Sequence, residues 1–347
     1  MAATNRFLYC WGLSLALATA SSGQVPQGMA APEHPVSQRK APPRQAAALP
    51  VTSSKVTAVP AFSYLGPVQC DGDGSLFFHS AIEQFDDAAI FKLAQPDDSK
   101  SRMFKLPTNL FEANVFLAFA VSPSGTLYVL TQDQENVFHV FNFDSDGEVK
   151  SDAKPDTPDH LFPVSLAVLG NEALFLAGYY LQDAPENLRG KGYAALFDSS
   201  GRLLRDLTNR FSLERADPDP AAAYRSIAIR SAPDGNLYLL KAHTVLVISQ
   251  SGEVVRRLRF TAPDQNEVAA DLRVTAGLVS IELEPPNPTE RIRPKYLVLD
   301  AMTGREYGYF ARPEEDKGLT VCFTREAGFS FLDNEKKHFR LINAALR

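Results

Sequence analysis

The chain has 347 residues, of which 45% are hydrophobic, 10% aromatic and 22% charged. This balance is typical of a folded globular protein and excludes a disordered, collagen-like or multi-span membrane chain. The formal net charge is −6, from 35 Lys and Arg against 41 Asp and Glu. Nucleic acid is therefore not an expected partner, because that affinity needs a broad basic surface.

Residues 1–20 have the layout of a secretory signal peptide. One basic residue, Arg6, precedes an apolar stretch that begins at Phe7, and the segment closes on Ala-Thr-Ala at residues 18–20. The apolar stretch is shorter than the ~20 residues of a membrane-spanning helix. We expect cleavage before Ser21, export to the periplasm or out of the cell, and no transmembrane segment in the mature chain. An uncleaved N-terminal anchor is the alternative.

Residues 21–60 are rich in Pro, Ala, Ser and Gln and contain no aromatic residue. Such a segment cannot bury enough apolar surface to offset the entropy lost on ordering. We therefore expect a disordered linker over residues 21–60, followed by a folded domain over residues 61–347.

A repeat of about fifty residues runs through the folded part. Four segments share a hydrophobic run, a polar turn that closes on glycine, and a second apolar run: residues 137–149, 193–207, 244–258 and 295–310. Each segment predicts two strands joined by a tight turn, in which glycine supplies a positive φ. The turn glycines are Gly147, Gly201, Gly252 and Gly304.

A second kind of paired apolar run precedes these segments. Six such pairs occur, at residues 68–78, 120–130, 165–178, 229–240, 273–283 and 320–332. Six units of four short strands follow, rich in β-branched and aromatic residues. A four-stranded sheet cannot cover both of its faces alone, so neighbouring units must stack, and a ring leaves no open end. The sequence predicts an all-β fold, a six-bladed β-propeller of four-stranded antiparallel blades.

The last unit is one strand short. After residues 320–332 the chain holds only one further strand, within residues 337–347. We expect the outer strand of this blade to come from the N-terminal side, around residues 54–62. Such an exchange would join the two ends of the domain.

Two strings in the second unit resemble a known type of repeat. PSGTLYV at residues 123–129 and FNFDSDGEV at residues 141–149 are similar to the NHL type of six-bladed β-propeller and, more loosely, to the TolB-like propellers. The resemblance covers roughly residues 61–347. It implies a ring whose exposed loops bind proteins or ligands, with a minority of relatives acting as metal-assisted hydrolases or lyases. The only tryptophan, Trp11, lies in the signal-peptide segment, so a WD-repeat propeller is excluded.

The turn at residues 142–147 matches the start of a calcium-binding EF-hand loop. Ala153 stands where such a loop needs its final Glu, and the corresponding turn at residues 249–252 has serine and glutamine in place of the acids. We interpret the turn as a plain hairpin. The Gly-rich string at residues 190–195 precedes a strand rather than a helix, so it does not predict a dinucleotide site.

Cys70 and Cys322 are the two cysteines of the exported part. They fall in the first strands of the first and last blades, which are neighbours in a closed ring. In an oxidising compartment a disulfide between them would clasp the ring. The alternative is two buried free thiols, which the divergence of adjacent first strands favours.

Loops that precede the first strand of a blade face the mouth of the central channel, where propellers usually place function. Counting back from each first turn gives six comparable positions for ligand binding: Tyr64, Asn114, His160, Arg225, Glu267 and Lys317. The alternative is that these are ordinary solvated loop residues.

These features predict an exported binding module for a protein partner or a small ligand in the cell envelope or outside the cell, with no cofactor and no catalytic residue. The alternative is a metal-assisted lactonase-like or lyase-like enzyme at the channel mouth. Asn114, His160 and Glu267 would then hold a divalent metal. A purely structural module of the envelope is the third hypothesis.

Overall fold

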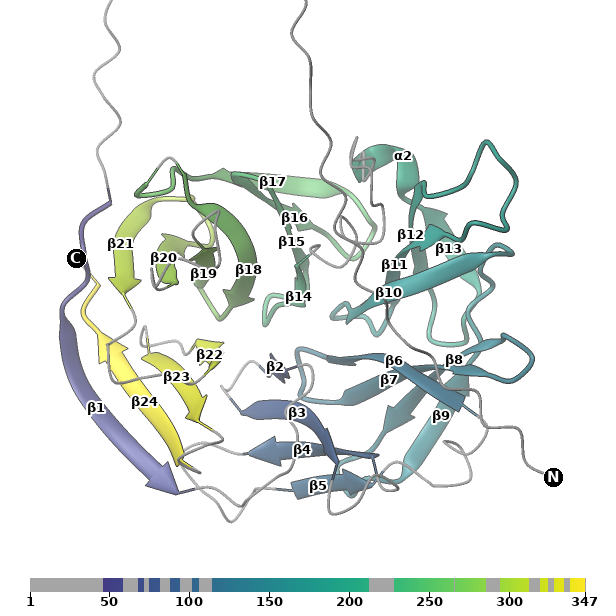
Figure 1. The fold of residues 1–347 in the computed structure, drawn as a ribbon, viewed down its shortest axis with the longest axis horizontal. Coiled ribbons are helices and arrows are strands. Elements are labelled where there is room, and N and C mark those ends of the chain that lie inside the picture. The colour runs from purple at the N-terminus through teal and green to yellow at the C-terminus, as the bar shows by residue number, and fades with distance from the viewer. Residues whose placement is uncertain are drawn as a thin grey trace, which may run out of the picture. The chain divides into compact units, whose positions relative to one another are not determined.

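Almost every regular element of the described chain is a β-strand (Figure 1). The structure is a computed structural model, and it describes residues 46–58, 68–71, 75–81, 88–93, 102–105, 114–211, 228–264, 266–284, 294–311, 319–323, 328–333 and 338–346. The helix within these ranges is the short α2, Thr208–Phe211. No helix of the described residues has the length and apolar character needed to cross a membrane. The predicted signal peptide, residues 1–20, lies outside the described ranges.

The described strands form six four-stranded antiparallel sheets. In five of them the strands pair in the order in which they follow one another along the chain. The strands of these five sheets are β2 (Val68–Cys70), β3 (Leu76–Ala81), β4 (Ala88–Leu93) and β5 (Arg102–Lys105); β6 (Asn114–Val121), β7 (Leu127–Asp133), β8 (Phe138–Phe143) and β9 (Val149–Ala153); β10 (Leu161–Val168), β11 (Leu174–Tyr180), β12 (Gly192–Phe197) and β13 (Leu203–Asp206); β14 (Ile229–Ser231), β15 (Leu237–Lys241), β16 (Thr244–Ile248) and β17 (Val254–Arg259); and β18 (Val268–Val274), β19 (Leu278–Glu284), β20 (Lys295–Asp300) and β21 (Glu306–Ala311).

The sixth sheet contains β22 (Leu319–Phe323), β23 (Gly328–Asp333) and β24 (His338–Ala344), and its outer strand is β1 (Val51–Ala58). The first strands of successive sheets contact one another in the order β2, β6, β10, β14, β18 and β22, and β22 contacts β2. Figure 1 shows these strands nearest a common centre. This arrangement is a β-propeller, and the prediction of an all-β propeller is confirmed.

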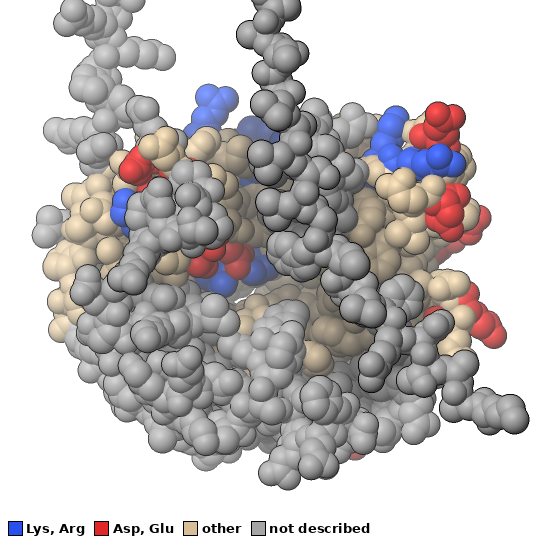
Figure 2. All heavy atoms as spheres, viewed as in Figure 1, with Lys and Arg blue, Asp and Glu red and all other residues tan. Residues whose placement is uncertain are grey.

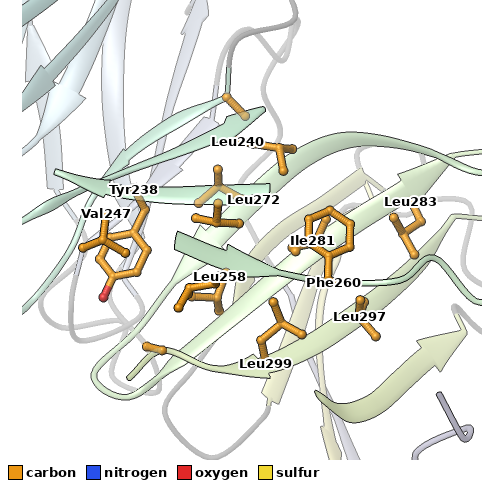
Figure 3. Close-up of a cluster of buried hydrophobic side chains, with 14 of the residues drawn as sticks. Tyr238, Leu240, Val247, Leu258, Phe260, Leu272, Ile281, Leu283, Leu297 and Leu299 are labelled. Carbon is orange, nitrogen blue, oxygen red and sulfur yellow. The ribbon is translucent and has the colours of Figure 1, made fainter. Parts of the chain in front are cut away.

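The hydrophobic core lies between neighbouring sheets. One cluster joins the β14–β17 sheet to the β18–β21 sheet, and Figure 3 shows Val247 and Leu258 from the first sheet near Leu272, Ile281 and Leu299 from the second. All five side chains are buried. Burying one such side chain contributes about 1.5–3 kcal/mol. The stacking that the repeat requires is therefore made by apolar faces that cover one another.

Glycine closes the last hairpin in four of the sheets. Gly147, Gly201, Gly252 and Gly304 have φ angles of 90°, 93°, 77° and 73°. Residues with a Cβ rarely adopt this left-handed region, whereas glycine does so without strain. The four predicted turns are confirmed.

Strand β1 pairs antiparallel with β24, from Val51 opposite Ala344 to Ala58 opposite His338. The predicted strand exchange between the two ends of the domain is confirmed, with these bounds in place of residues 54–62.

The residues before β1 also pack on the propeller. Leu49 is buried, and its N–H donates to the Tyr309 carbonyl at 2.7 Å. Residues 46–58 therefore belong to the folded part, although the composition of residues 21–60 predicts a disordered linker. The average over that long stretch conceals a local run with the β-branched residues of a strand.

Cys70 in β2 and Cys322 in β22 form a disulfide, with their Cα atoms 5.7 Å apart. The fold therefore contains the disulfide clasp. The alternative of two free thiols, which the divergence of adjacent first strands favours, is wrong. The reason is that β2 and β22 contact each other as the innermost strands of their sheets. This brings the two Cα atoms into the narrow range that a disulfide requires.

Candidate functional site

A pocket of about 550 Å³ opens between the β6–β9 sheet and the β10–β13 sheet. Three segments line it: the turn between β7 and β8, the connection from β9 to β10, and the loop between β11 and β12. Its apolar walls come from Val137, Phe138, Leu161 and Leu181. Polar and charged residues make up most of the remaining lining, so the pocket offers more polar than apolar surface to a ligand.

The polar groups of this pocket are mainly acidic. Glu135, Asp156, Asp159 and Asp183 line it, and none of the described lining residues is Lys or Arg. Figure 2 shows Asp and Glu side chains, with Lys and Arg side chains beside some of them, along the edge of the molecule where β8 and β10 to β13 lie in Figure 1. A hollow with one sign of charge concentrates ligands of the opposite sign. The pocket therefore favours a cationic group.

His160 directly precedes β10 at this pocket. Its φ angle is 61°, which is uncommon for a residue other than glycine. Its carbonyl accepts the Leu181 N–H at 2.8 Å, and its Nδ1 lies 3.2 Å from an Asp183 carboxylate oxygen. The side chain is still 40% exposed. Backbone and ring are thus both fixed against the β11–β12 loop while part of the imidazole remains accessible.

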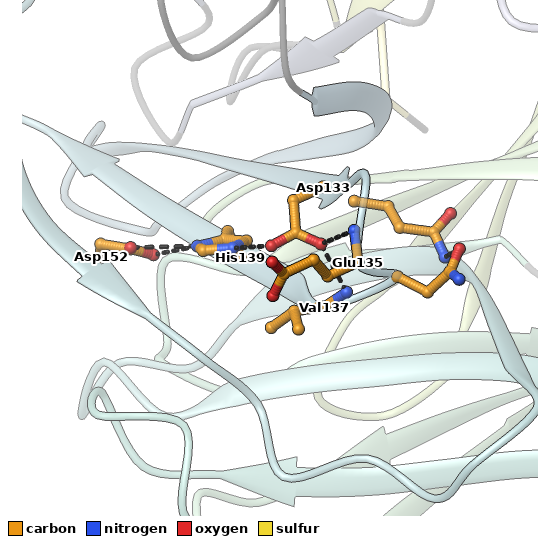
Figure 4. Close-up of polar contacts among 7 residues, drawn as sticks. Asp133, Glu135, Val137, His139 and Asp152 are labelled. Atoms are coloured by element: carbon orange, nitrogen blue, oxygen red, sulfur yellow. Dashed lines mark hydrogen bonds and ion pairs between the residues drawn. The ribbon is translucent and has the colours of Figure 1, made fainter.

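The opposite wall, the β7–β8 turn, is held by Asp133. One oxygen of Asp133 accepts the N–H groups of Glu135 and Val137, at 2.9 and 2.8 Å. The other lies 3.2 Å from His139 Nε2. The Val137 N–H and the contact with His139 hold the pKa of Asp133 below its ordinary value, although partial burial opposes them. Figure 4 shows the network continuing to Asp152 on β9.

The turn that resembles an EF-hand loop uses its acid internally. One Asp144 oxygen accepts the N–H groups of Asp146 and Glu148, at 2.8 and 3.0 Å, and these bonds hold the pKa of Asp144 below its ordinary value. At the equivalent turn Ser249 accepts the Glu253 N–H. Asp144 and Ser249 make the same bond at equivalent turns, so this side chain serves to form the turn. This agrees with the interpretation of the turn as a plain hairpin. No group of three or more His, Cys, Asp or Glu able to hold a metal occurs in the described part of the chain.

The structure describes only some of the six positions predicted for the ring. His160 is the one of these residues that lines the described pocket. Glu267 is buried; one of its oxygens lies 2.6 Å from Lys295 Nζ and the other accepts the Asp264 N–H. Of Asn114 only the backbone is described, as the first residue of β6. The remaining three positions lie outside the described residues: Tyr64, Arg225 and Lys317.

Glu135, Asn136 and Asp183 are pocket residues that the sequence did not predict. They lie in loops between the second and third strands of their sheets. In a four-stranded antiparallel sheet these loops emerge at the same end as the connection to the next sheet. The topology therefore contained a signal, because both kinds of loop meet at one face of a propeller.

A separate charged cluster lies on the inner strands β14 and β18. Arg230 Nη2 lies 2.7 and 2.9 Å from the two oxygens of Asp271, and Arg273 also pairs with Asp271. Burial alone would raise the pKa of Asp271, but the two guanidinium groups outweigh it and hold the pKa below its ordinary value. This cluster joins neighbouring sheets.

No known protein family matches the chain, and no curated protein matches it in sequence. Among solved structures it resembles the Pan2 WD40 domain of Neurospora crassa at 10% identity and a TM-score of 0.43, over 87% of this chain and 98% of the other. It resembles the Cps50 (Swd1) β-propeller domain of Myceliophteria thermophila at 12% identity and 0.40, over 84% and 100%. A protein of unknown function from Bacteroides caccae matches at 9% and 0.40, over 73% and 81%. At these values the similarity carries no information about function.

Proposed function

We propose that this protein is an exported six-bladed β-propeller of the NHL-like or TolB-like type that binds a partner through the pocket beside His160. The observation that carries the proposal is the acidic pocket of about 550 Å³ between two neighbouring sheets. Its ligand is a cationic group, the ammonium or guanidinium of a protein side chain or of a small molecule.

The proposed number of blades is supported by the contacts of the inner strands. Each described sheet has its first strand against the first strand of the next, and β22 returns to β2. A seventh blade would have to separate one of these pairs. The strings at residues 123–129 and 141–149 support the NHL-like assignment.

The proposed export is supported by two independent features. Residues 1–20 have the charge, length and small-residue ending of a signal peptide. The disulfide between Cys70 and Cys322 is of a kind that persists in oxidising compartments and is rare in the cytosol.

The proposed ligand class follows from charge and shape together. Carboxylates come from both sheets: Glu135 and Asp156 from one side, Asp183 from the other. The same pocket also contains apolar residues, Val137 and Leu181 among them, which suit the aliphatic stem of a lysine or arginine side chain. Charge-assisted bonds from ammonium or guanidinium to these carboxylates would fix the charged end. We do not propose the metal-assisted enzyme, since the carboxylate of Glu267 is engaged by Lys295.

The test uses the chain without residues 1–20 as bait in an envelope extract. It compares the wild-type sequence with a pocket variant and a control variant. The pocket variant carries Asp156→Asn and Asp159→Asn; both side chains are exposed, so the fold is unaffected. The control variant carries Asp146→Asn and Glu148→Gln, which remove equal charge at a turn outside the pocket lining. We expect about tenfold less partner captured by the pocket variant and no loss in the control. Equal capture by all three proteins would contradict the proposal.

A direct assay uses N-acetyl-arginine amide as the probe. The chain has six histidines, so the imidazole carbon–proton signals are few, and His160→Gln assigns the His160 signal. Addition of the probe should shift this signal in the wild type and in the control variant. The pocket variant should require a much higher probe concentration.

A further inference from the structure

Two outer edges of the propeller are covered by the chain's own N-terminal segment. The edge of β24 takes β1 as an added antiparallel strand. The edge of β21 takes residues 47–49, where the Tyr309 N–H donates to the Ala47 carbonyl at 2.9 Å and the Leu49 N–H donates to the Tyr309 carbonyl at 2.7 Å. The bridge at this second edge is parallel. The rim of this fold therefore accepts an extended segment in either direction.

Strand β17 is an outer strand whose free edge pairs with no described strand. It is the last strand of its sheet, and Figure 1 shows it along the upper rim. Along a strand, successive N–H groups point to opposite sides. The Phe260 N–H donates inward to the His243 carbonyl at 3.2 Å, so the N–H groups of Arg257 and Arg259 point outward. The edge of β17 thus offers backbone donors to an added segment.

A carboxylate already occupies one position at the end of this edge. Thr261 is two residues beyond Arg259, so its N–H has the same outward direction. This N–H donates to Glu306 Oε1 at 2.9 Å. Glu306 is the first residue of β21, in the neighbouring sheet. The intramolecular bond indicates that an acidic group is a suitable acceptor beside β17.

The side chains of β17 select the charge of an added segment. Val255, Arg257 and Arg259 are exposed, whereas Leu258 between the two arginines is buried against the β18–β21 sheet. The two arginines therefore share the opposite face. Neither forms an ion pair with a described residue, in contrast to Arg256, which pairs with an aspartate of its own sheet. Acidic residues at alternate positions of an opposing strand would match the two arginines.

We propose that the outer edge of β17 binds an extended acidic segment of a partner protein, which adds to the sheet as a fifth strand. Backbone hydrogen bonds hold the segment, and its acidic side chains pair with Arg257 and Arg259. Apolar side chains at the intervening positions extend the sheet face that contains Leu258. No residue of β17 lines the pocket beside His160. This second site has the opposite charge preference and does not rest on the proposed function.

The experiment uses a fluorescein-labelled peptide of three Val-Glu repeats and measures its binding by fluorescence anisotropy at low ionic strength. The protein is the chain without residues 1–20. Changing both Arg257→Gln and Arg259→Gln should weaken binding about fivefold or more. The control variant carries Lys150→Gln and Lys191→Gln, which remove equal charge from exposed positions outside β17. Equal losses in the two variants would overturn the proposal, because they would indicate attraction to the overall charge alone.

A second readout tests whether the peptide binds as a strand. In an antiparallel pair, directly opposite residues share a face. The glutamates opposite Arg257 and Arg259 would then point their N–H groups at β17, whereas in a parallel pair the valines would do so. We therefore expect N-methylation of only one of the two sets, either the glutamates or the valines, to abolish binding. Equal binding or equal loss for the two methylated peptides would contradict strand addition.

The other role of charges on a free edge is to prevent pairing between copies of the chain. In that case the variant with Arg257→Gln and Arg259→Gln would self-associate in sedimentation velocity, and the wild type would bind no Val-Glu peptide. This result would overturn the docking site. The pocket variant with Asp156→Asn and Asp159→Asn should bind the peptide as the wild type does, so the pocket and the β17 edge can fail independently.

Discussion

In the four sheets from β6 to β21, every strand pairs with its neighbour in the chain, whereas the sheet of β22–β24 takes its outer strand from the other end of the domain. The first kind of sheet is organised by connections between strands that are consecutive in the chain, most of them short turns. The second depends on β1 and on the disulfide to β2. The comparison teaches that local turn chemistry builds the repeated units, while contacts distant in sequence close the ring.

The largest effect is expected from removing the clasp. Replacing Cys70 and Cys322 by alanine should lower the free energy of unfolding by about 3–5 kcal/mol, because the disulfide joins residues 252 apart in the sequence. Chemical denaturation of the variant and of the reduced wild type should give similar losses. Unchanged stability would mean that the pairing of β1 with β24 closes the ring alone.

The next effect concerns the segment before β1. Leu49→Ala should cost about 2–4 kcal/mol, because Leu49 is buried in the cluster that contains Phe310, Phe329 and Ile342. The matched control is Leu346→Ala, whose exposed side chain should contribute less than about 0.5 kcal/mol. Equal losses, measured by the same denaturation, would show that residues 46–50 do not stabilise the closing sheet.

Two glycines test the locally built sheets. Gly201 and Gly277 both have a φ of 93°. A Cβ on Gly201 would meet the Lys154 carbonyl group, whereas one on Gly277 has nothing described within 4 Å. Gly277→Ala should cost about 1 kcal/mol for the backbone conformation alone, and Gly201→Ala about 2–3 kcal/mol because the neighbouring backbone must also move.

The same pair of variants also tests the pocket. The Gly201 carbonyl accepts the Asp156 N–H at 2.8 Å, and Asp156 lines the pocket. Binding of the arginine probe should therefore weaken in Gly201→Ala and stay unchanged in Gly277→Ala. Equal binding of the probe by the two variants would show that the turn at Gly201 does not position the pocket wall.

The smallest effect is a pH dependence at a single turn. The Ser200 hydroxyl and the Arg202 N–H lower the pKa of Asp198 from 3.8 to about 2. A lowered pKa gives stability that is complete above pH 3.8 and is lost as the pH falls towards about 2. The thermal midpoint of Asp198→Asn should therefore change less across this range than that of the wild type. Ser249, at the equivalent turn, adds no such dependence, so Ser249→Ala should leave the slope unchanged.

The locally determined features were predictable from sequence. The turn glycines and the polar residue at the start of each turn mark the hairpins directly, because each is set by the backbone within four residues. The missing strand of the last unit also pointed to the exchange with the N-terminal side. The bonded state of Cys70 and Cys322 was not predictable, because it depends on how closely two innermost strands approach.

The candidate site was predictable only in part. His160 follows from its place before a first strand. Glu135 and Asp183 belong to different sheets, and their approach is decided by how those sheets pack, which no local pattern encodes. Glu267 was expected at the channel mouth, but the sequence did not reveal that Lys295, on another strand, would engage its carboxylate.

The pairing of β1 with β24 has a consequence for synthesis of the chain. Among the described strands, β1 is made before the strands of the other five sheets, and β24, with which it pairs, is made after them. During translation, the edge of β1 remains without this partner while the intervening sheets form one after another. Ring closure is then a late step with a large loop to close, and the waiting edge is open to pairing with other chains. We therefore expect folding to benefit from a chaperone that covers the edge of β1 until β24 has been made.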